Sequence, residues 1–239
     1  MTQQTEPIAL YFAGTPNGYK ISIMLEELEV PYELHHVDIG KGDQFKPEFL
    51  KISPNNRIPA IADPEGPDGL PISVFESGAI LKYLAEKFGR FYPSDVRQRV
   101  AVDEWLFWQV GGFGPMLGQN HHFAIYAKEK IPYAIDRYRN ETHRLYGVLD
   151  HQLDGKDYIT GAYSIADMAT IGWARAYERQ GIDIEEFPNV KAWRERVFSR
   201  PAVIRAYEKG EAIKANVDLA SDDKAKAVLF NQRARKAGK

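Results

Sequence analysis

Apolar positions follow two different periods along this chain, and the change from one period to the other divides it. Short β-rich apolar runs predict four strands in the first part, at 8–12, 32–38, 58–62 and 70–75. The stretch between the first two strands carries apolar residues at the spacing of one helical face, at Ile21, Met24, Leu25 and Leu28. A strand, a helix and a strand in this order predict a right-handed crossover between parallel strands.

The third and fourth strands are predicted to form a hairpin, since a loop rich in Pro and Gly at 64–69 joins them. A short helical turn is expected before this hairpin, at 47–50. A longer helix is expected after it, with its buried stripe at Ile80, Leu84 and Phe88. The predicted order of the first part is therefore βαβ–ββα.

Strand signals end near residue 95, and the second part reads as helical. Helices are predicted at 95–109, at 132–153, from Ser164, at 188–198 and after Pro201. The glycine-rich segment 111–115 is expected to interrupt the first of them. We place a domain boundary at 91–94, which gives an α/β domain at 1–90 and an all-α domain at 95–239. Within the second domain, 211–239 is expected to be a helical or frayed extension.

Composition removes several classes of function. The 239 residues carry a net charge of −2, which gives no electrostatic reason to expect nucleic acid or an anionic membrane as partner. No apolar run has the length of a membrane span, and the N-terminus lacks the features of a signal peptide, so a soluble cytoplasmic protein is expected. The absence of cysteine excludes disulfides, thiolate metal sites and a cysteine nucleophile. No metal site is predicted.

Pro59 stands at the threshold of the third predicted strand. Because proline has no N–H to give a sheet ladder, it belongs at the first residue of a strand or at an edge. A cis bond between Ile58 and Pro59 would turn the backbone N–H and C=O of Ile58 into a groove. An extended peptide could then pair with them as an added strand does.

Glu76 and Ser77 stand where the fourth predicted strand becomes a helix. The unpaired N–H groups and the dipole of a helix start make such a junction an anion site. Ser77 could equally be only a helix cap, the commonest use of serine at this place. Together with the groove at Pro59, the junction predicts a small acidic peptide as ligand.

The order βαβ–ββα followed by helices resembles the cytosolic glutathione transferase superfamily, over residues 8–208. Three motifs carry the resemblance: Ser-Pro-Asn-Asn-Arg-Ile-Pro-Ala from residue 53, Phe-Glu-Ser-Gly-Ala-Ile from 75 and Ser-Ile-Ala-Asp from 164. Two more, Thr-Pro-Asn-Gly from 15 and Trp-Gln-Val-Gly-Gly-Phe-Gly-Pro-Met from 108, resemble the bacterial Nu-class branch, whose members act on glutathione disulfide bonds. The resemblance implies a thioredoxin-like N-terminal domain, an all-helical C-terminal domain and a homodimer.

The resemblance also implies where the sulfur of glutathione would lie. Redox relatives of the thioredoxin-like domain place a Cys-x-x-Cys pair after the first strand, and this chain has Thr15 and Asn17 there. Neither side chain can bond covalently to sulfur, but a hydroxyl, an amide and a helix start can favour the thiolate of a bound thiol, whose free pKa is near 8.5. The nucleophile would then belong to the ligand. Taken alone, the same four residues also fit an ordinary turn.

Further roles in binding glutathione follow from the resemblance. It implies that Ser77 takes the γ-glutamyl carboxylate and Glu76 the ammonium group, while Gln44 and Arg57 meet the glycyl end. Gln44 and Arg57 could as easily be solvated surface residues. Arg137 resembles an arginine that crosses the dimer interface to a second glutathione, and a solvent-facing arginine is nearly as well supported.

Three functions remain after this reading of the sequence. The first is a glutathione-dependent disulfide-bond oxidoreductase that uses bound glutathione in place of a protein cysteine. The second is conjugation of glutathione to electrophiles, with Thr15 as the activating hydroxyl. The third is a regulatory protein that keeps the fold and binds glutathione without turnover. Room for a second glutathione, as opposed to an apolar pocket, would favour the first.

Overall fold

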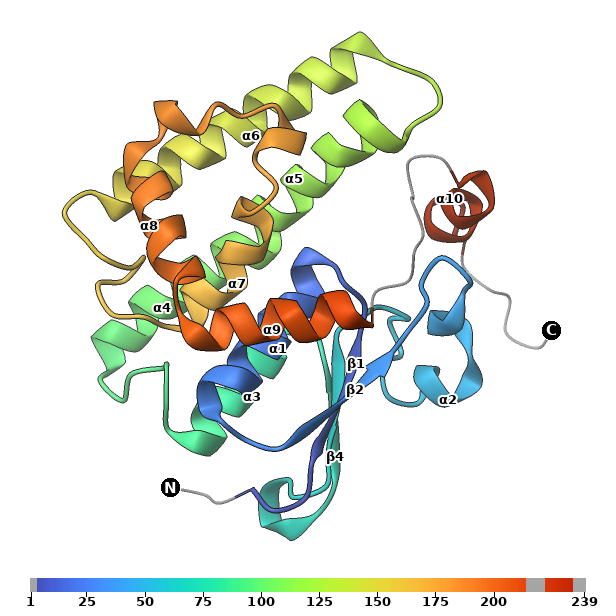
Figure 1. Ribbon diagram of the computed structural model, residues 1–239, viewed down its shortest axis with the longest axis vertical. Coiled ribbons are helices and arrows are strands. Elements are labelled where there is room, and N and C mark those ends of the chain that lie inside the picture. The colour runs from blue at the N-terminus through green and yellow to red at the C-terminus, as the bar shows by residue number, and fades with distance from the viewer. Residues whose placement is uncertain (1–3, 214–221, 234–239) are drawn as a thin grey trace.

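The structure is a computed structural model that describes residues 4–213 and 222–233. A four-stranded sheet forms the N-terminal part, in the order β2-β1-β3-β4 (Figure 1). Its strands are β1 (Ile8–Phe12), β2 (Tyr32–His36), β3 (Ala60–Asp63) and β4 (Ile72–Phe75). Strands β1 and β2 run parallel, as the predicted crossover requires, whereas β3 pairs antiparallel with both β1 and β4.

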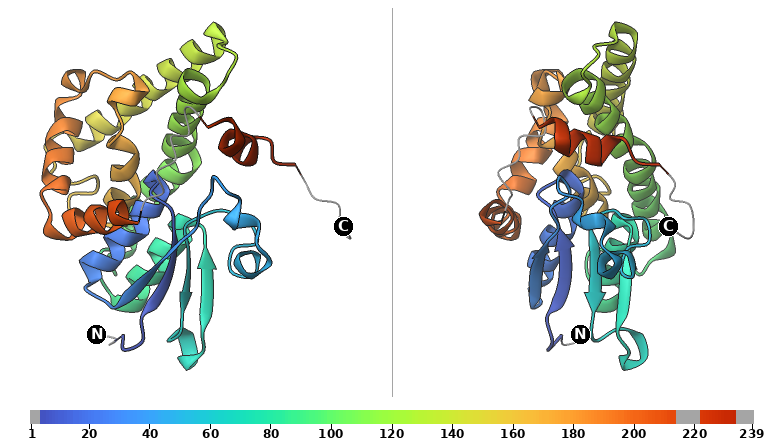
Figure 2. Two further views of the ribbon diagram at one scale, coloured as in Figure 1. Left: turned by 45° about the vertical axis from the view of Figure 1, so that its right-hand side comes forward. Right: turned by 90° about the vertical axis from the view of Figure 1, so that its right-hand side faces the viewer.

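The alternation of side chains along β1 assigns the two faces of the sheet. Three helices accompany the sheet, α1 (Pro16–Leu28), α2 (Pro47–Leu50) and α3 (Ser77–Phe88). Ile8, Leu10 and Phe12 are fully buried in the large core that α1 and α3 complete. Tyr11 points the other way and packs against Phe49 of α2. Figure 2 shows α1 and α3 between the sheet and the later helices, with α2 on the opposite side.

The C-terminal part is helical, and its core is continuous with that of the sheet. Its helices are α4 (Val96–Trp108), α5 (Gly114–His121), α6 (Pro132–Leu153), α7 (Ile165–Ala174), α8 (Pro188–Phe198), α9 (Pro201–Ala212) and α10 (Asp223–Phe230). Both α7 and α9 pack against α1. Tyr146 and Trp193 are the largest side chains of the helical core and are fully buried. Within the described residues, no helix is both long and apolar enough to cross a bilayer.

A buried carboxylate organises the start of α7. Asp167 is fully buried and accepts hydrogen bonds from the backbone N–H groups of Ser164 and Ile159, each at 3.0 Å. Trp193 Nε1 donates to the same carboxylate at 2.9 Å, which ties α7 to α8. Ser164 caps the helix in return, so Ser164 and Asp167 form a capping box.

Ion pairs join the first helix of the sheet part to the last helices of the helical part. Glu27 on α1 receives a bidentate pair from the Arg200 guanidinium. The neighbouring Glu26, 6% exposed, accepts from Arg205 Nε at 2.8 Å and from Lys209. These contacts, with the packing of α7 and α9 on α1, hold the two parts together.

The elements differ from the sequence-based expectation mainly at their edges. Strand β3 begins at Ala60, two residues later than predicted, because Pro59 has no N–H for the ladder. Strand β4 begins at Ile72, just after Pro71, for the same reason. The helix predicted at 132–153 and the one at 188–198 have the expected bounds.

The glycine-rich segment after α4 does not interrupt the helix, contrary to expectation. The chain passes from α4 into α5 through a π-helical turn, Gln109–Phe113, which keeps the backbone hydrogen bonded. Pro115 follows this turn directly, in the first turn of α5, and the chain remains helical through it. Gly114 serves close packing, since a Cβ there would lie 3.1 Å from Trp173 Nε1.

Candidate active site

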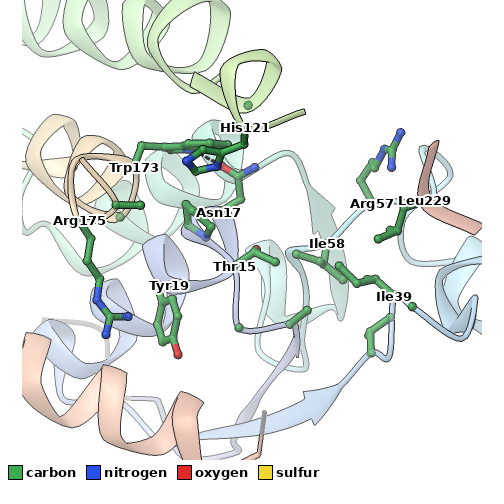
Figure 3. A pocket seen from close by; sticks show the side chains of 18 of the residues that line it. Thr15, Asn17, Tyr19, Ile39, Arg57, Ile58, His121, Trp173, Arg175 and Leu229 are labelled. Carbon is green, nitrogen blue, oxygen red and sulfur yellow. Dashed lines mark hydrogen bonds between the residues drawn. The ribbon is translucent and has the colours of Figure 1, made fainter. Parts of the chain in front are cut away.

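A cavity of about 840 Å³ lies between the thioredoxin-like sheet and the helical part. Its walls come from the turn before α1, the loops after β2 and before β3, and from α5, α7 and α10 (Figure 3). A smaller cavity of about 200 Å³ adjoins it at Asn17, Arg57 and Ile58. Of the predicted site residues, Thr15 and Gln44 line the large cavity, and Pro59, Glu76 and Ser77 line the small one. Eight of the nine site residues predicted from the sequence therefore line these two adjoining cavities.

Thr15 is the N-cap of α1. Its Oγ1 accepts a hydrogen bond from the Gly18 N–H at 3.2 Å, so the hydroxyl hydrogen remains available to the cavity. A Cβ at Gly18 would lie 2.2 Å from the backbone oxygen of Ala13, and only glycine allows this tight turn. The sequence thus fixes the hydroxyl at a helix start as a donor.

Asn17 is oriented by an indole from the helical part. Trp173 Nε1 donates to Asn17 Oδ1 at 3.0 Å, which assigns the oxygen to the tryptophan and leaves the amide NH₂ without a partner among the described residues (Figure 3). A Cβ at Gly172 would lie 2.6 Å from the Pro16 oxygen, so glycine is what lets α7 bring Trp173 this close. Thr15 and Asn17 therefore both present donors to the cavity, beside the positive end of α1.

The groove between the two cavities is formed by the segment before β3. The Ile58–Pro59 peptide is cis, and Ile58 lines both cavities. Opposite it, Glu76 has a φ of +68°, a conformation that non-glycine residues rarely adopt. Its carboxylate accepts from Asn55 Nδ2 at 3.2 Å, so the two walls of the small cavity are joined. Backbone strain of this kind gathers at binding sites.

Ser77 begins α3 and is backed by a lysine that the sequence analysis did not select. Lys20 on α1 is 2% exposed, and its Nζ lies 3.3 Å from Ser77 Oγ and 2.6 Å from Gln109 Oε1. Burial lowers the pKa of Lys20 to about 7, against the opposing influence of the Glu76 carboxylate. The small cavity thus has a helix start, a hydroxyl and a buried cation on one side and the Glu76 carboxylate on the other.

Gln44 and Arg57 both line the large cavity on the side of the sheet part. Gln44 is buried, donates from Nε2 to the Ile39 oxygen at 3.1 Å, and leaves its Oε1 without a partner among the described residues. That oxygen suits a ligand N–H rather than a carboxylate. Arg57 is exposed and lines both cavities beside Leu229, so it is the group here that could meet a carboxylate (Figure 3).

The helical wall of the large cavity carries His121, Arg175 and Arg179. Burial lowers the pKa of His121 to about 4, with the Arg179 charge acting in the same direction, so the imidazole is neutral near pH 7. Arg175 stacks on Tyr207 and lies 3.8 Å from Glu211. This wall therefore offers cationic and neutral donors to a second anionic ligand.

Arg137 is not part of either cavity. It lies on α6, its side chain is 56% exposed, and it is 3.9 Å from Glu141. Phe113 is also outside both cavities: it is fully buried in the core, where Trp108 stacks on it.

The C-terminal end of α10 lines the edge of the large cavity beside Arg57 (Figure 3). Leu229 and Phe230 line the cavity, and the Phe230 ring packs edge-on against His122 at 4.8 Å. Asn56 Nδ2 donates to Gln232 Oε1 at 3.3 Å, which ties the following residues to the β3 side. Of the predicted extension 211–239, the structure describes 211–213, at the end of α9, and 222–233, which include α10 at the site, whereas 214–221 and 234–239 lie outside the described residues.

Metal binding has no support within residues 4–213 and 222–233. No three His, Asp or Glu side chains gather there in a way that could hold an ion.

Two family models match this chain. The "Glutathione S-transferase, N-terminal domain" covers residues 6–86, and the "Glutathione S-transferase, C-terminal domain" covers residues 115–201. The chain belongs to the glutathione S-transferase family. The predicted family is therefore confirmed, and so is the predicted fold of a thioredoxin-like domain followed by helices.

Three similar members of the glutathione S-transferase family indicate its branch. The disulfide-bond oxidoreductase YfcG of Escherichia coli strain K12 is 57% identical over 206 residues, which are 85% of this chain and 96% of that protein. A Pseudomonas fluorescens pf-5 transferase structure with two glutathione bound has 47% identity and a TM-score of 0.81, over 85% of this chain and 93% of that one. A Pseudomonas putida transferase structure with one glutathione disulfide per subunit has 43% identity and a TM-score of 0.82, over 87% and 93%.

The site residues that sequence reasoning missed share one property. Lys20 and Trp173 act through partners that lie 57 and 156 positions away along the chain, at Ser77 and Asn17. Lys20 carried one available signal, because it falls within the apolar helix 16–28 beside Ile21. A lysine placed there is one that the fold has to bury.

Proposed function

We propose that this glutathione S-transferase is a glutathione-dependent disulfide-bond oxidoreductase of the Nu-class branch, acting in the cytoplasm as a homodimer. One observation carries the proposal. The side-chain oxygens of Thr15 and Asn17 accept hydrogen bonds from Gly18 and Trp173, so that both side chains present donors to the cavity. Donors favour a thiolate over a thiol. The chain has no cysteine, so that thiolate has to be supplied by the ligand.

The proposed reaction is a pair of thiol–disulfide exchanges. The thiolate of bound glutathione attacks one sulfur of a disulfide R–S–S–R′, forms a new S–S bond and expels R′–S⁻. A second glutathione thiolate attacks the glutathione sulfur of this mixed disulfide, and glutathione disulfide and R–S⁻ leave. Two glutathione thiols are oxidised, one disulfide is reduced, and the two protons lost by glutathione match those gained by the product thiols.

The other site residues hold the peptide in this proposal. Ser77 and the start of α3 take the γ-glutamyl carboxylate, and Glu76 takes the ammonium group. The backbone of Ile58, before Pro59, pairs with the cysteinyl residue. Arg57 takes the glycyl carboxylate.

Gln44 has a different part in the glycyl end of the site. Its unpartnered oxygen suits the glycyl N–H of the ligand. The second glutathione lies against the wall of His121 and Arg179, and Arg137 reaches it from the partner subunit. The related structure with two glutathione bound supports room for both.

The test is turnover of a small mixed disulfide by glutathione in the wild type, Asn17→Ala and Thr15→Ala. We expect kcat/KM to fall at least about tenfold in each variant, because a hydrogen bond to a charged group is worth about 1.5–3 kcal/mol. Thr15→Ser, which keeps the hydroxyl, is the matched control and should retain most activity. Melting temperatures separate this effect from loss of the Thr15 cap.

A wild type that binds glutathione and reduces no disulfide would contradict the proposal. Conjugation of glutathione to an electrophile would then be the function to test. Iodoacetamide treatment of the glutathione-free protein, followed by dialysis, provides a second check. A chain without cysteine should keep its activity after this treatment.

A further inference from the structure

Lys20 is a buried cation whose position needs an explanation. Its side chain is fully enclosed between α1, α3 and the π-helical turn that follows α4. The two groups that accept from its Nζ, Ser77 Oγ and Gln109 Oε1, are both uncharged. Buried lysines are ordinarily paired with a carboxylate, because burying an isolated charge is costly. Glu76 acts on Lys20 through its charge, but the hydrogen bonds of the ammonium group go to Ser77 and Gln109, so a ligand carboxylate would add the charge that the site lacks.

The surroundings of Lys20 are built to hold it in place. Gln109 is fully buried at the start of the π-helical turn, and its Oε1 faces the ammonium group while its Nε2 has no partner among the described residues. The buried Nε2 of Gln109 makes no hydrogen bond, which costs free energy. The short hydrogen bond that Gln109 Oε1 accepts from Lys20 offsets this cost. π-Helical turns of this kind occur often at functional sites.

We propose that Lys20 is a positioning residue of the γ-glutamyl carboxylate subsite, where it fixes the Ser77 hydroxyl and supplies a buried positive charge. The inference rests on the proposed function, because it takes Ser77 as the group that receives the carboxylate. An ammonium group can only donate, so the Ser77 oxygen accepts from Lys20 and its hydrogen points at the ligand. A neutral amine can accept, and the Ser77 hydrogen would then turn inward, away from the carboxylate.

Charge reinforces this geometry. In a site with low dielectric constant, a buried cation one hydroxyl away from a carboxylate acts strongly on it. The groups that face Lys20 are the Glu76 carboxylate from the β4–α3 junction, the neutral Gln109 from the π-helical turn and Ser77 itself. Since burial brings the pKa of Lys20 to about 7, a bound carboxylate should raise it. Binding above pH 7 should therefore take up a proton.

The experiment measures binding by calorimetry with two probes that have no free thiol. One is S-methylglutathione, and the other is its analogue in which a 4-aminobutanoyl group replaces the γ-glutamyl group, so that only the carboxylate is lost. We expect Lys20→Met to bind S-methylglutathione about tenfold more weakly than the wild type does. The affinities of the variant and the wild type for the analogue should agree within twofold. Lys82→Met, which removes a cation of α3 outside the cavities, is the matched control and should bind both probes normally.

A second readout needs no variant. Wild-type titrations with S-methylglutathione at pH 7.5–8.0, in two buffers of different ionisation enthalpy, should show uptake of a fraction of a proton per site. The analogue should show none, and neither should Lys20→Met. If the variant fails to fold, this measurement alone decides, and the absence of proton uptake in the wild type would overturn the role of Lys20.

Ser77→Ala separates the failure of this inference from failure of the proposed site. If Ser77→Ala binds S-methylglutathione as the wild type does, and the analogue binds equally well, the carboxylate is not held there and the proposed site is wrong. If Ser77→Ala weakens binding of S-methylglutathione and the analogue binds the wild type weakly, the carboxylate subsite is supported. If Lys20→Met nevertheless binds S-methylglutathione as the wild type does, the role of Lys20 is refuted.

Discussion

Asn17 can donate to a ligand sulfur in only one of the two orientations of its amide. The bond from Trp173 Nε1 to Asn17 Oδ1 selects that orientation, because an amide turned the other way would set its NH₂ against the indole N–H. In the proposed reaction, Trp173 would thereby act through Asn17 without having to touch the sulfur. Glycine in α5 leaves room for its ring, since a Cβ at Gly118 would lie 3.3 Å from it.

Replacing the indole tests this arrangement at the scale of one hydrogen bond. We expect Trp173→Phe to lower kcat/KM for disulfide reduction about fivefold, the effect of a neutral hydrogen bond worth about 1 kcal/mol. The double variant Trp173→Phe with Asn17→Ala should be little worse than Asn17→Ala alone, because the two act as one unit. Trp105→Phe is the control, since Trp105 does not line the cavity. Additive losses in the double variant would contradict the coupling.

The sequence predicts the position of a residue best where the local structure decides that position. Thr15 and Ser77 stand at helix starts, and the neighbouring residues in the sequence indicate where a helix starts. Trp173 and Lys20 gain their roles from long-range packing, which a periodic pattern does not encode. Arg137 stays a prediction, because its proposed contact is with a second subunit.

At the scale of elements, the position of α7 depends on glycine. Gly172 lies where any side chain would meet the Pro16 oxygen, so α7 can pack directly on the turn that begins α1. This contact sets the spacing between the thioredoxin-like sheet and the helical wall of the cavity. The sequence predicted a helix from Ser164, but it did not predict which face of that helix meets the site.

The helix α10 is the element whose role was least predictable from sequence. We expect a chain that ends at Ser221, and so lacks α10, to open the large cavity beside Arg57. Its kcat/KM for a glutathionylated peptide, relative to a small mixed disulfide, should rise about threefold or more as the steric limit is removed. Phe230→Ala in the full chain should move this ratio in the same direction.

The control for α10 is Lys224→Ala, which changes the helix at an exposed position. An unchanged ratio in both the shortened chain and Phe230→Ala would show that α10 does not restrict the substrate. Equal gains for the large and the small disulfide would point to faster product release instead.

At the scale of the whole molecule, the two parts are joined through carboxylates of α1. Burial favours the protonated form of Glu26, but hydrogen bonds from Lys209, Tyr32 and Arg205 outweigh it and hold the pKa of Glu26 below its usual value of 4.5. A carboxylate with a lowered pKa stabilises the folded state above about pH 4.5. That contribution is lost as the pH falls through the lower, folded-state pKa.

We expect Glu26→Gln to lower the free energy of unfolding at pH 7 by about 2 kcal/mol, since hydrogen bonds to a charged group are lost. The difference from the wild type should shrink as the pH falls below about 4.5, where Glu26 itself becomes protonated. Urea unfolding at several pH values measures both effects. Glu29→Gln, at an exposed position of the same region, should show neither. A difference that stays constant into acid would rule out the charge as its source.

The hydrogen bond between Trp173 and Asn17 also gives the protein an intrinsic fluorescence signal for occupancy of the cavity. An indole that lines the cavity and donates to the residue proposed to hold sulfur has an emission that depends on what occupies that space. Trp193, by contrast, is fully buried in the helical core and should be silent to ligands. Intrinsic fluorescence can therefore follow occupancy of the site in real time, without a label, and its loss in Trp173→Phe would assign the signal.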